Sequence, residues 1–127
     1  MPQITVDYSA TMAAAFDRAG FAEALHSATV EIAAAKPEAC KTQFRRTEDT
    51  LVGFEDEGHA VVHVMIGLLA GRTEETKARL TEAVLELLSK YIEDDGFALH
   101  ASVEVRELDA SYRSARTPAR SAVRPGR

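Results

Sequence analysis

The 127-residue sequence contains a single cysteine, Cys40, and no long run of apolar residues. One cysteine excludes a disulfide bond within the chain and is typical of proteins that fold in a reducing compartment. No apolar stretch approaches the roughly 18 residues of a membrane-spanning helix. The first residues also lack the basic and apolar segments of a signal peptide. We therefore expect a cytoplasmic protein of one domain that does not enter a membrane.

Sequence signatures of several kinds of chemistry are missing as well. There is no glycine-rich phosphate loop, and no serine lies in a motif that would make it a nucleophile. His59 and His63 are four residues apart, which would suit a metal site on a helix, but they fall in or beside a predicted strand. No cysteine or acidic residue completes a ligand set around them. We expect neither a metal ion nor a cofactor.

Charged residues are unevenly distributed along the chain. Residues 110–127 contain no acid and no lysine, but they contain five arginines: Arg113, Arg116, Arg120, Arg124 and Arg127. Because the whole chain has a net charge of −5, residues 1–109 carry −10. An acidic body argues against nucleic acid as a partner. The tail over 111–127 has two prolines and no large apolar face, which predicts a flexible segment; binding of an anionic partner by the tail is the alternative.

The pattern of apolar residues predicts a strand–helix–strand order that occurs twice. The six elements are a strand over 3–8, a helix over about 11–35, a strand over about 40–52, a strand over 60–69, a helix from Thr73 to about Gly96 and a strand over about 99–108. The acidic turn at 53–58 predicts a hairpin between its flanking strands. Because residues 60–69 are almost all apolar, we expect this strand to be buried on both faces.

Each half of the chain, about 2–53 and 59–108, is thus predicted to be a β-α-β unit with parallel strands. Two fused units predict an α+β domain over residues 1–110, with a four-stranded mixed sheet and two helices on one face. The opposite face of the sheet, which also carries apolar residues, must then be shielded from water by something else. Self-association is the simplest way to provide this shielding.

Pro2 is the main candidate for a catalytic residue, because it follows the initiator methionine and opens the first strand. Removal of Met1 would leave a secondary amine at the N-terminus. An α-amino group has an ordinary pKa of about 7.7–8.0, and burial or nearby cations favour its neutral form. A neutral amine is a suitable general base near pH 7. The alternative is that Pro2 only starts a strand, where a missing N–H is harmless.

Two motifs, Pro2-Gln-Ile-Thr-Val-Asp-Tyr-Ser and Ala70-Gly71-Arg72, resemble those of the tautomerase superfamily. The first half has the proline without Gly-Arg. The second half has Gly-Arg, with Val62 at the position of the proline. A chain of two halves with one complete site is similar to the 5-carboxymethyl-2-hydroxymuconate delta-isomerase branch, and the resemblance covers roughly residues 2–113.

The resemblance implies an isomerase of aromatic (homoprotocatechuate) catabolism that forms a homotrimer and uses no cofactor. Pro2 would be the general base that converts 5-carboxymethyl-2-hydroxymuconate to its 2-oxo-3-ene isomer. Arg72 would bind the carboxylate substrate, helped by Lys41, Arg45 or Arg46; the branch usually has an arginine where this chain has Lys41. Two alternatives are a tautomerase for another enol or keto acid, and a non-catalytic binding protein of the same fold.

Overall fold

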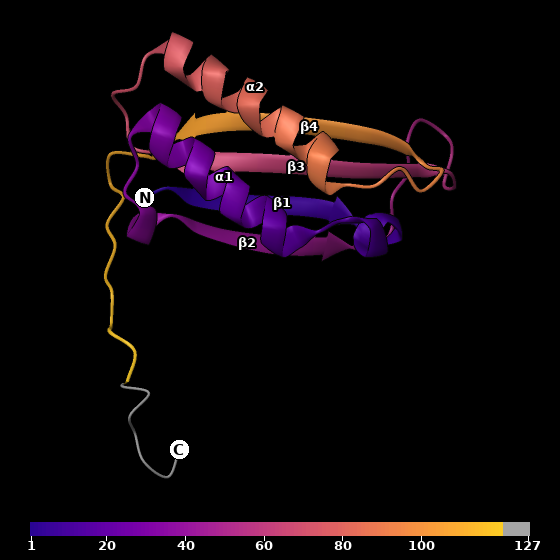
Figure 1. Cartoon of the computed structure of the whole chain (residues 1–127), viewed down its shortest axis with the longest axis horizontal. Helices are drawn as coiled ribbons and strands as arrows, with labels where there is room; N and C mark the ends of the chain where they lie inside the picture. The colour runs from indigo at the N-terminus through magenta and orange to yellow at the C-terminus, as the bar shows by residue number, and fades with distance from the viewer. Residues whose placement is uncertain (121–127) are drawn as a thin grey trace.

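The computed structural model describes residues 1–120. Four strands form one sheet in the order β2-β1-β3-β4 (Figure 1). The elements are β1 (Gln3–Ser9), α1 (Arg18–Ala33), β2 (Lys41–Thr47), β3 (His59–Leu68), α2 (Glu74–Tyr91) and β4 (Ala98–Glu107). β1 runs parallel to β2, β3 runs parallel to β4, and β1 and β3 are antiparallel. These pairings confirm the predicted α+β fold of two β-α-β halves.

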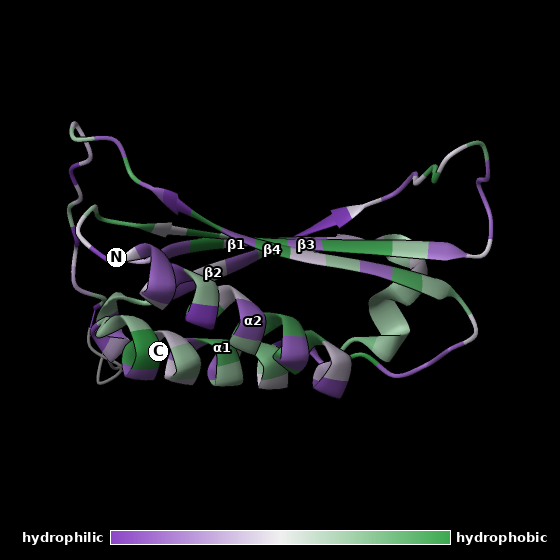
Figure 2. Ribbon diagram, turned by 90° about the horizontal axis from the view of Figure 1, so that it is seen from above, coloured by the Kyte–Doolittle hydropathy of each residue, from purple (hydrophilic) through white to green (hydrophobic). Residues whose placement is uncertain are grey.

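Both helices cover the same face of the sheet, as Figure 2 shows. The hydrophobic core lies between them and the sheet, and alternate residues of the central strands contribute to it. Its fully buried members include Val6, Val62, Val64, Ile66, Phe21, Leu25, Leu80, Val84 and Leu88. The other face, called here the open face, carries the remaining strand residues. The prediction that β3 is buried on both faces is wrong for the single chain, because Val61, His63 and Met65 on the open face stay partly exposed.

The predicted helix over 11–35 is divided in two. A short 3₁₀ helix spans Ala10–Ala15, and α1 begins only at Arg18. Between them Phe16 is extended and forms an isolated bridge with Ile92, which stops the first helix. Asp17 then caps α1 by accepting a hydrogen bond from the backbone N–H of Gly20 at 3.0 Å. Gly20 therefore lies in the first turn of α1.

The predicted hairpin around 53–58 is also wrong. β1 lies between β2 and β3, so the strands on either side of this segment do not pair with each other. β2 ends at Thr47. Residues 48–58, called here the acidic arm, form a local turn with a bridge between Val52 and Glu55. In Figure 2 the arm extends away from the sheet on the side of the open face.

The remaining sequence predictions concern α2 and the ends of the chain. Thr73, where the sequence predicted the second helix to begin, caps α2 by accepting a hydrogen bond from Thr76 N–H at 3.1 Å, and the helix ends at Tyr91, before the predicted end near Gly96. Residues 113–120 have no regular secondary structure, while Arg124 and Arg127 lie outside the described residues. Within residues 1–120, the helices lack the combination of length and apolar character needed to cross a bilayer.

Candidate functional site

Pro2 is buried and directly precedes β1. The register pairs Gln3 with Lys41 on one side and with Gly67 on the other. Pro2 therefore lies at the end of the sheet where β1 and β2 begin and β3 and β4 finish, called here the proline end. The backbone N–H of Lys41 donates a hydrogen bond to the carbonyl of Pro2 at 3.2 Å, so the starts of β1 and β2 are held together.

A cation lies beside the N-terminal amine at the proline end. The amine of Met1 and the Nζ of Lys41 both donate to the carbonyl of Ala39, at 3.3 and 2.8 Å. Burial lowers the pKa of the Met1 amine, and the neighbouring Lys41 ammonium lowers it further. The Met1 amine, one residue before Pro2, is thus biased toward its neutral, basic form.

Arg72 lies at the same end, where β3 passes into α2. Its Nε and Nη2 donate to the carbonyl of Ala33 at 3.1 and 2.9 Å, and its Nη1 donates to the carbonyl of Leu69 at 3.2 Å. The guanidinium therefore joins the C-terminus of α1 to the loop before α2. In the described part of the chain its recorded acceptors are neutral carbonyls, so its positive charge is not compensated by a carboxylate. Three of its five N–H groups are used.

The space around Arg72 suits an anion. A cavity of about 490 Å³ is lined by Arg72, Gly71 and Thr73 together with the end of α1. The first turn of α2 borders the same cavity through Thr76. Backbone N–H groups at a helix N-terminus attract negative charge, and here they add to the charge of Arg72.

Arg45 and Arg46 lie farther along β2, away from Pro2. Arg45 forms a bidentate pair with Asp7, with Nε–Oδ1 and Nη2–Oδ2 distances of 2.7 and 3.0 Å. Arg46 is opposite Tyr8 in the register and pairs with Glu48 at 3.1 Å. Tyr8 is six residue steps along the chain from Pro2, or about 20 Å. Within one chain the structure thus brings Lys41, but not Arg46, to Pro2.

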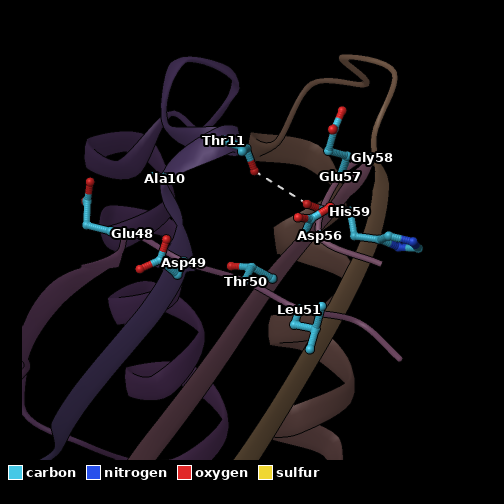
Figure 3. A pocket seen from close by; sticks show the side chains of 10 residues that line it. All are labelled: Ala10, Thr11, Glu48, Asp49, Thr50, Leu51, Asp56, Glu57, Gly58 and His59. Atoms are coloured by element: carbon cyan, nitrogen blue, oxygen red, sulfur yellow. Dashed lines mark hydrogen bonds between the residues drawn. The ribbon is translucent and has the colours of Figure 1, made fainter. Parts of the chain in front are cut away.

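A cavity larger than the one beside Arg72 is at the opposite end of the sheet from Pro2. It measures about 620 Å³ and is lined by the acidic arm and the residues after β1. Figure 3 shows four carboxylates around it, from Glu48, Asp49, Asp56 and Glu57. These charges disfavour a substrate with several carboxylates. Volume alone therefore points to the wrong end of the molecule for such a substrate.

Two features of the proline end could not be found from the sequence. One is the carbonyl of Ala39, which the N-terminal amine and Lys41 share. The other is the pair of carbonyls, from Ala33 and Leu69, that hold Arg72. Backbone acceptors have no side-chain signature, and they depend on how a helix end and a loop meet in space.

Similarity to known proteins identifies the family of this chain. The family model described as 5-carboxymethyl-2-hydroxymuconate isomerase matches residues 2–122. No curated protein matches the chain in sequence. The chain is similar in structure to a 5-carboxymethyl-2-hydroxymuconate isomerase from Deinococcus radiodurans R1, with 18% identity, a TM-score of 0.74 and coverage of 91% of this chain and 90% of that one.

Two further solved structures share the fold. A fused 4-OT described as a symmetric trimer has 23% identity, a TM-score of 0.67 and coverage of 84% and 85% of the two chains. A 5-carboxymethyl-2-hydroxymuconate delta-isomerase has 12% identity, a TM-score of 0.67 and coverage of 92% and 89%. At these identities the structures establish the fold, while the family model spans nearly the whole sequence. The chain belongs to the 5-carboxymethyl-2-hydroxymuconate isomerase family and is a tautomerase-type isomerase.

Proposed function

We propose that the chain converts 5-carboxymethyl-2-hydroxymuconate to its 2-oxo-3-ene isomer, in homoprotocatechuate catabolism, with Pro2 as the general base. Met1 must be removed first, because a retained Met1 makes the nitrogen of Pro2 an amide without basicity. The observation that carries the proposal is the carbonyl of Ala39 beside Pro2, to which Lys41 and, before its removal, the Met1 amine both donate. This contact keeps a cation next to the amine and favours its unprotonated form.

The reaction moves one proton along a conjugated system. The nitrogen of Pro2 takes the proton from the 2-hydroxyl group, and the electron pair of that bond forms the 2-oxo group. The 2,3 double bond shifts to the 3,4 position, and the former 4,5 bond takes up the proton at carbon 5. The prolinium delivers this proton and returns to the neutral amine. A single base is sufficient, since the proton gained and the proton lost are both carried by one nitrogen.

Lys41 and Arg72 are the proposed substrate-binding cations. The substrate has three carboxylates, and its 2-oxygen gains negative charge as the hydroxyl proton leaves. Arg72 has two N–H groups left after its bonds to Ala33 and Leu69, and it borders the cavity at the start of α2. A fixed guanidinium and helix N-terminus stabilise such charge without having to reorganise. Lys41 holds a carboxylate as a point charge, without the bidentate fork of an arginine.

We propose further that the chain works as a homotrimer that buries the open face. Polar side chains on this face are already paired, as in the contact of His63 with Glu104 at 2.8 Å. Support comes from a fused 4-OT of the same fold that is described as a symmetric trimer. In such an assembly Arg46, which is about 20 Å from Pro2 of its own chain, would meet substrate only from a neighbouring subunit.

The decisive experiment follows the ultraviolet absorption of the dienol with protein whose N-terminus has been read by mass spectrometry. Pro2→Ala should lower kcat by about 100-fold or more, since a positioned base contributes about 10²–10⁴. A panel with phenylenolpyruvate and 2-hydroxymuconate tests whether another enol acid is preferred. The proposed base is wrong if Pro2→Ala, with Met1 removed, isomerises every substrate at the rate of the unmodified chain.

A further inference from the structure

The chain that follows β4 starts at the proline end of the sheet. β4 runs parallel to β3 and finishes beside it, and the backbone N–H of Leu108 donates to the carbonyl of Leu68 at 2.7 Å. Gly67, the residue before Leu68, pairs with Gln3, which directly follows Pro2. Two strand spacings, or about 10 Å, therefore separate Pro2 from the point where this part of the chain leaves the sheet.

A short turn determines the direction in which the chain leaves β4. The carboxylate of Asp109 accepts from Ser111 N–H at 2.8 Å, and the N–H of Tyr112 donates to the carbonyl of Asp109 at 2.9 Å. The Nη1 of Arg113 donates to two carbonyls of the same turn, at 3.1 and 2.8 Å. In Figures 1 and 2 the chain after the turn passes the end of the sheet where the N-terminus lies. The turn therefore directs residues 113–120 past the proline end.

Residues 113–120, called here the arginine segment, carry positive charge without an acid to offset it. The three arginines of the segment are exposed: Arg113, Arg116 and Arg120. In the part of the chain that the structure describes, none of them forms an ion pair with a carboxylate. Like charges repel one another along a chain and keep it extended. The arginine segment thus presents its charge to the solvent in front of the proline end.

We propose that the arginine segment captures carboxylates of the substrate at the proline end and makes the site selective for acids with several carboxylates. This inference rests on the isomerase function proposed above and names what selects its substrate. The eight residue steps from Leu108 to Arg116 span up to about 28 Å when extended. That span exceeds the distance from Leu108 to Pro2 even with the turn in between, so Arg116 can reach a substrate bound there.

The charges of the site leave a role for the segment. A substrate with three carboxylates has more negative charge than Lys41 and Arg72 together can neutralise. Charge of one sign around a site raises the rate at which oppositely charged ligands arrive, by about 10–10³-fold. Each further carboxylate on the ligand increases this attraction, whereas the proton transfer at Pro2 stays the same. The arginine segment should therefore change substrate capture and leave kcat unchanged.

The test replaces the three arginines of the segment together. Changing all three to glutamine lowers the charge of residues 110–127 from +5 to +2. For 5-carboxymethyl-2-hydroxymuconate, kcat/KM should then fall at least about fivefold in dilute buffer and less than about twofold in about 0.5 M salt, because salt screens exposed charges. Changing the same three arginines to lysine is the matched control, and it should stay within about twofold of the unmodified chain. Phenylenolpyruvate, which has one carboxylate, should lose less than about twofold with the glutamine variant.

A second measurement does not require isomerase activity. Propane-1,2,3-tricarboxylate is titrated into the full chain with Met1 removed, and the backbone amides are followed by ¹H–¹⁵N NMR. The tricarboxylate should shift the amides of Lys41, Arg72 and Arg116 together and leave that of Gly53, in the acidic arm, in place. The glutamine variant should bind the tricarboxylate at least about fivefold more weakly in dilute buffer, and the lysine variant should bind it as the unmodified chain does.

The outcomes separate this inference from the proposed function. If the glutamine variant binds the tricarboxylate and isomerises the dienol as the unmodified chain does, the inference is wrong and the proposed function stands. If the tricarboxylate shifts the amide of Arg116 but not those of Lys41 and Arg72, the segment binds anions away from the site, which also overturns the inference. If no dienol is isomerised while the glutamine variant loses tricarboxylate binding, the proposed function fails and the capture of polycarboxylates by the segment stands.

Discussion

The two ends of the sheet use their cations differently. At the proline end, Lys41 and Arg72 donate to backbone carbonyls, which are neutral. At the other end, Arg45 and Arg46 donate to the carboxylates of Asp7 and Glu48. A cation bonded to carbonyls is held in place and keeps its net charge, whereas a cation paired with a carboxylate does not. The proline end is therefore prepared for an anion, although the chain as a whole is acidic.

Replacing Arg72 should have the largest effect on this contrast. Arg72→Ala removes the charge and leaves the carbonyls of Ala33 and Leu69 without this donor. A lost hydrogen bond to a charged group is worth about 1.5–3 kcal/mol, so kcat/KM should fall about 10–100-fold. Urea unfolding should show a loss of about 1–3 kcal/mol in stability from the unsatisfied acceptors.

Arg72→Lys separates the two roles of this residue. Lysine keeps the charge but cannot bond both carbonyls with a fixed fork. It should restore part of the substrate affinity while stability stays reduced. If Arg72→Ala lowers stability but leaves kcat/KM intact, Arg72 only joins α1 to the loop before α2 and does not bind substrate.

Lys41 should control the pH dependence of the reaction. The base works when it is neutral, so a lowered amine pKa extends activity to lower pH. At the Met1 amine, one residue before Pro2, burial is the larger cause of a lowered pKa and Lys41 the next, and we expect the Pro2 amine exposed by removal of Met1 to meet the same neighbour. Lys41→Gln should therefore raise the pKa of the amine and move the acid limb of kcat/KM to higher pH, without abolishing activity above it. The measurement is a pH–rate profile, with Lys90→Gln in α2 as the control. If the acid limb of Lys41→Gln stays where it is in the unmodified chain, Lys41 does not influence the pKa of the base.

Substitution of one glycine at each end of the sheet compares how much each end contributes to the stability of the fold. A side chain at Gly67 would come within 2.9 Å of Leu108 and 3.2 Å of the carbonyl of Gln3, so Gly67→Ala should cost about 1–3 kcal/mol and disturb the strand behind Pro2. Gly53, in the acidic arm, has a φ of 60° and open space around it. Gly53→Ala should cost only about 1 kcal/mol of left-handed strain. Urea unfolding measures the stability of each variant, and kcat/KM measures its activity. A loss of activity in Gly53→Ala but not in Gly67→Ala would contradict the expectation that the proline end is the active one.

The sequence was sufficient for the repeated β-α-β order, because the apolar periodicity of α2 and the apolar run of β3 are strong signals. It was insufficient where tertiary contacts determine the ends of an element or the pairing of strands. The bridge between Phe16 and Ile92 interrupts what looks like one alanine-rich helix. Likewise, an acidic turn between two strands looks the same whether the strands pair or are separated by β1. The positions of Lys41 and Arg46 relative to Pro2 followed only from the strand register.

The smallest effect should come from the charges of the acidic arm. Asp56→Asn with Glu57→Gln removes two charges at the end opposite Pro2. Because the screening length is about 8 Å at physiological salt, charges about 20 Å away act only weakly. We expect kcat/KM for a polycarboxylate to rise less than about threefold in dilute buffer and not at all in 0.15 M salt, with kcat unchanged.

The salt dependence of kcat/KM in this variant distinguishes a weak long-range field from a direct contact with substrate. A rise that persists in salt would mean that the acids lie near a bound substrate. Within one chain the register forbids this, so the arm of one subunit would then have to reach the Pro2 of another. The same measurement at protein concentrations below and above the point of assembly separates the two cases, because a contact between subunits disappears on dilution and the weak field within one chain does not.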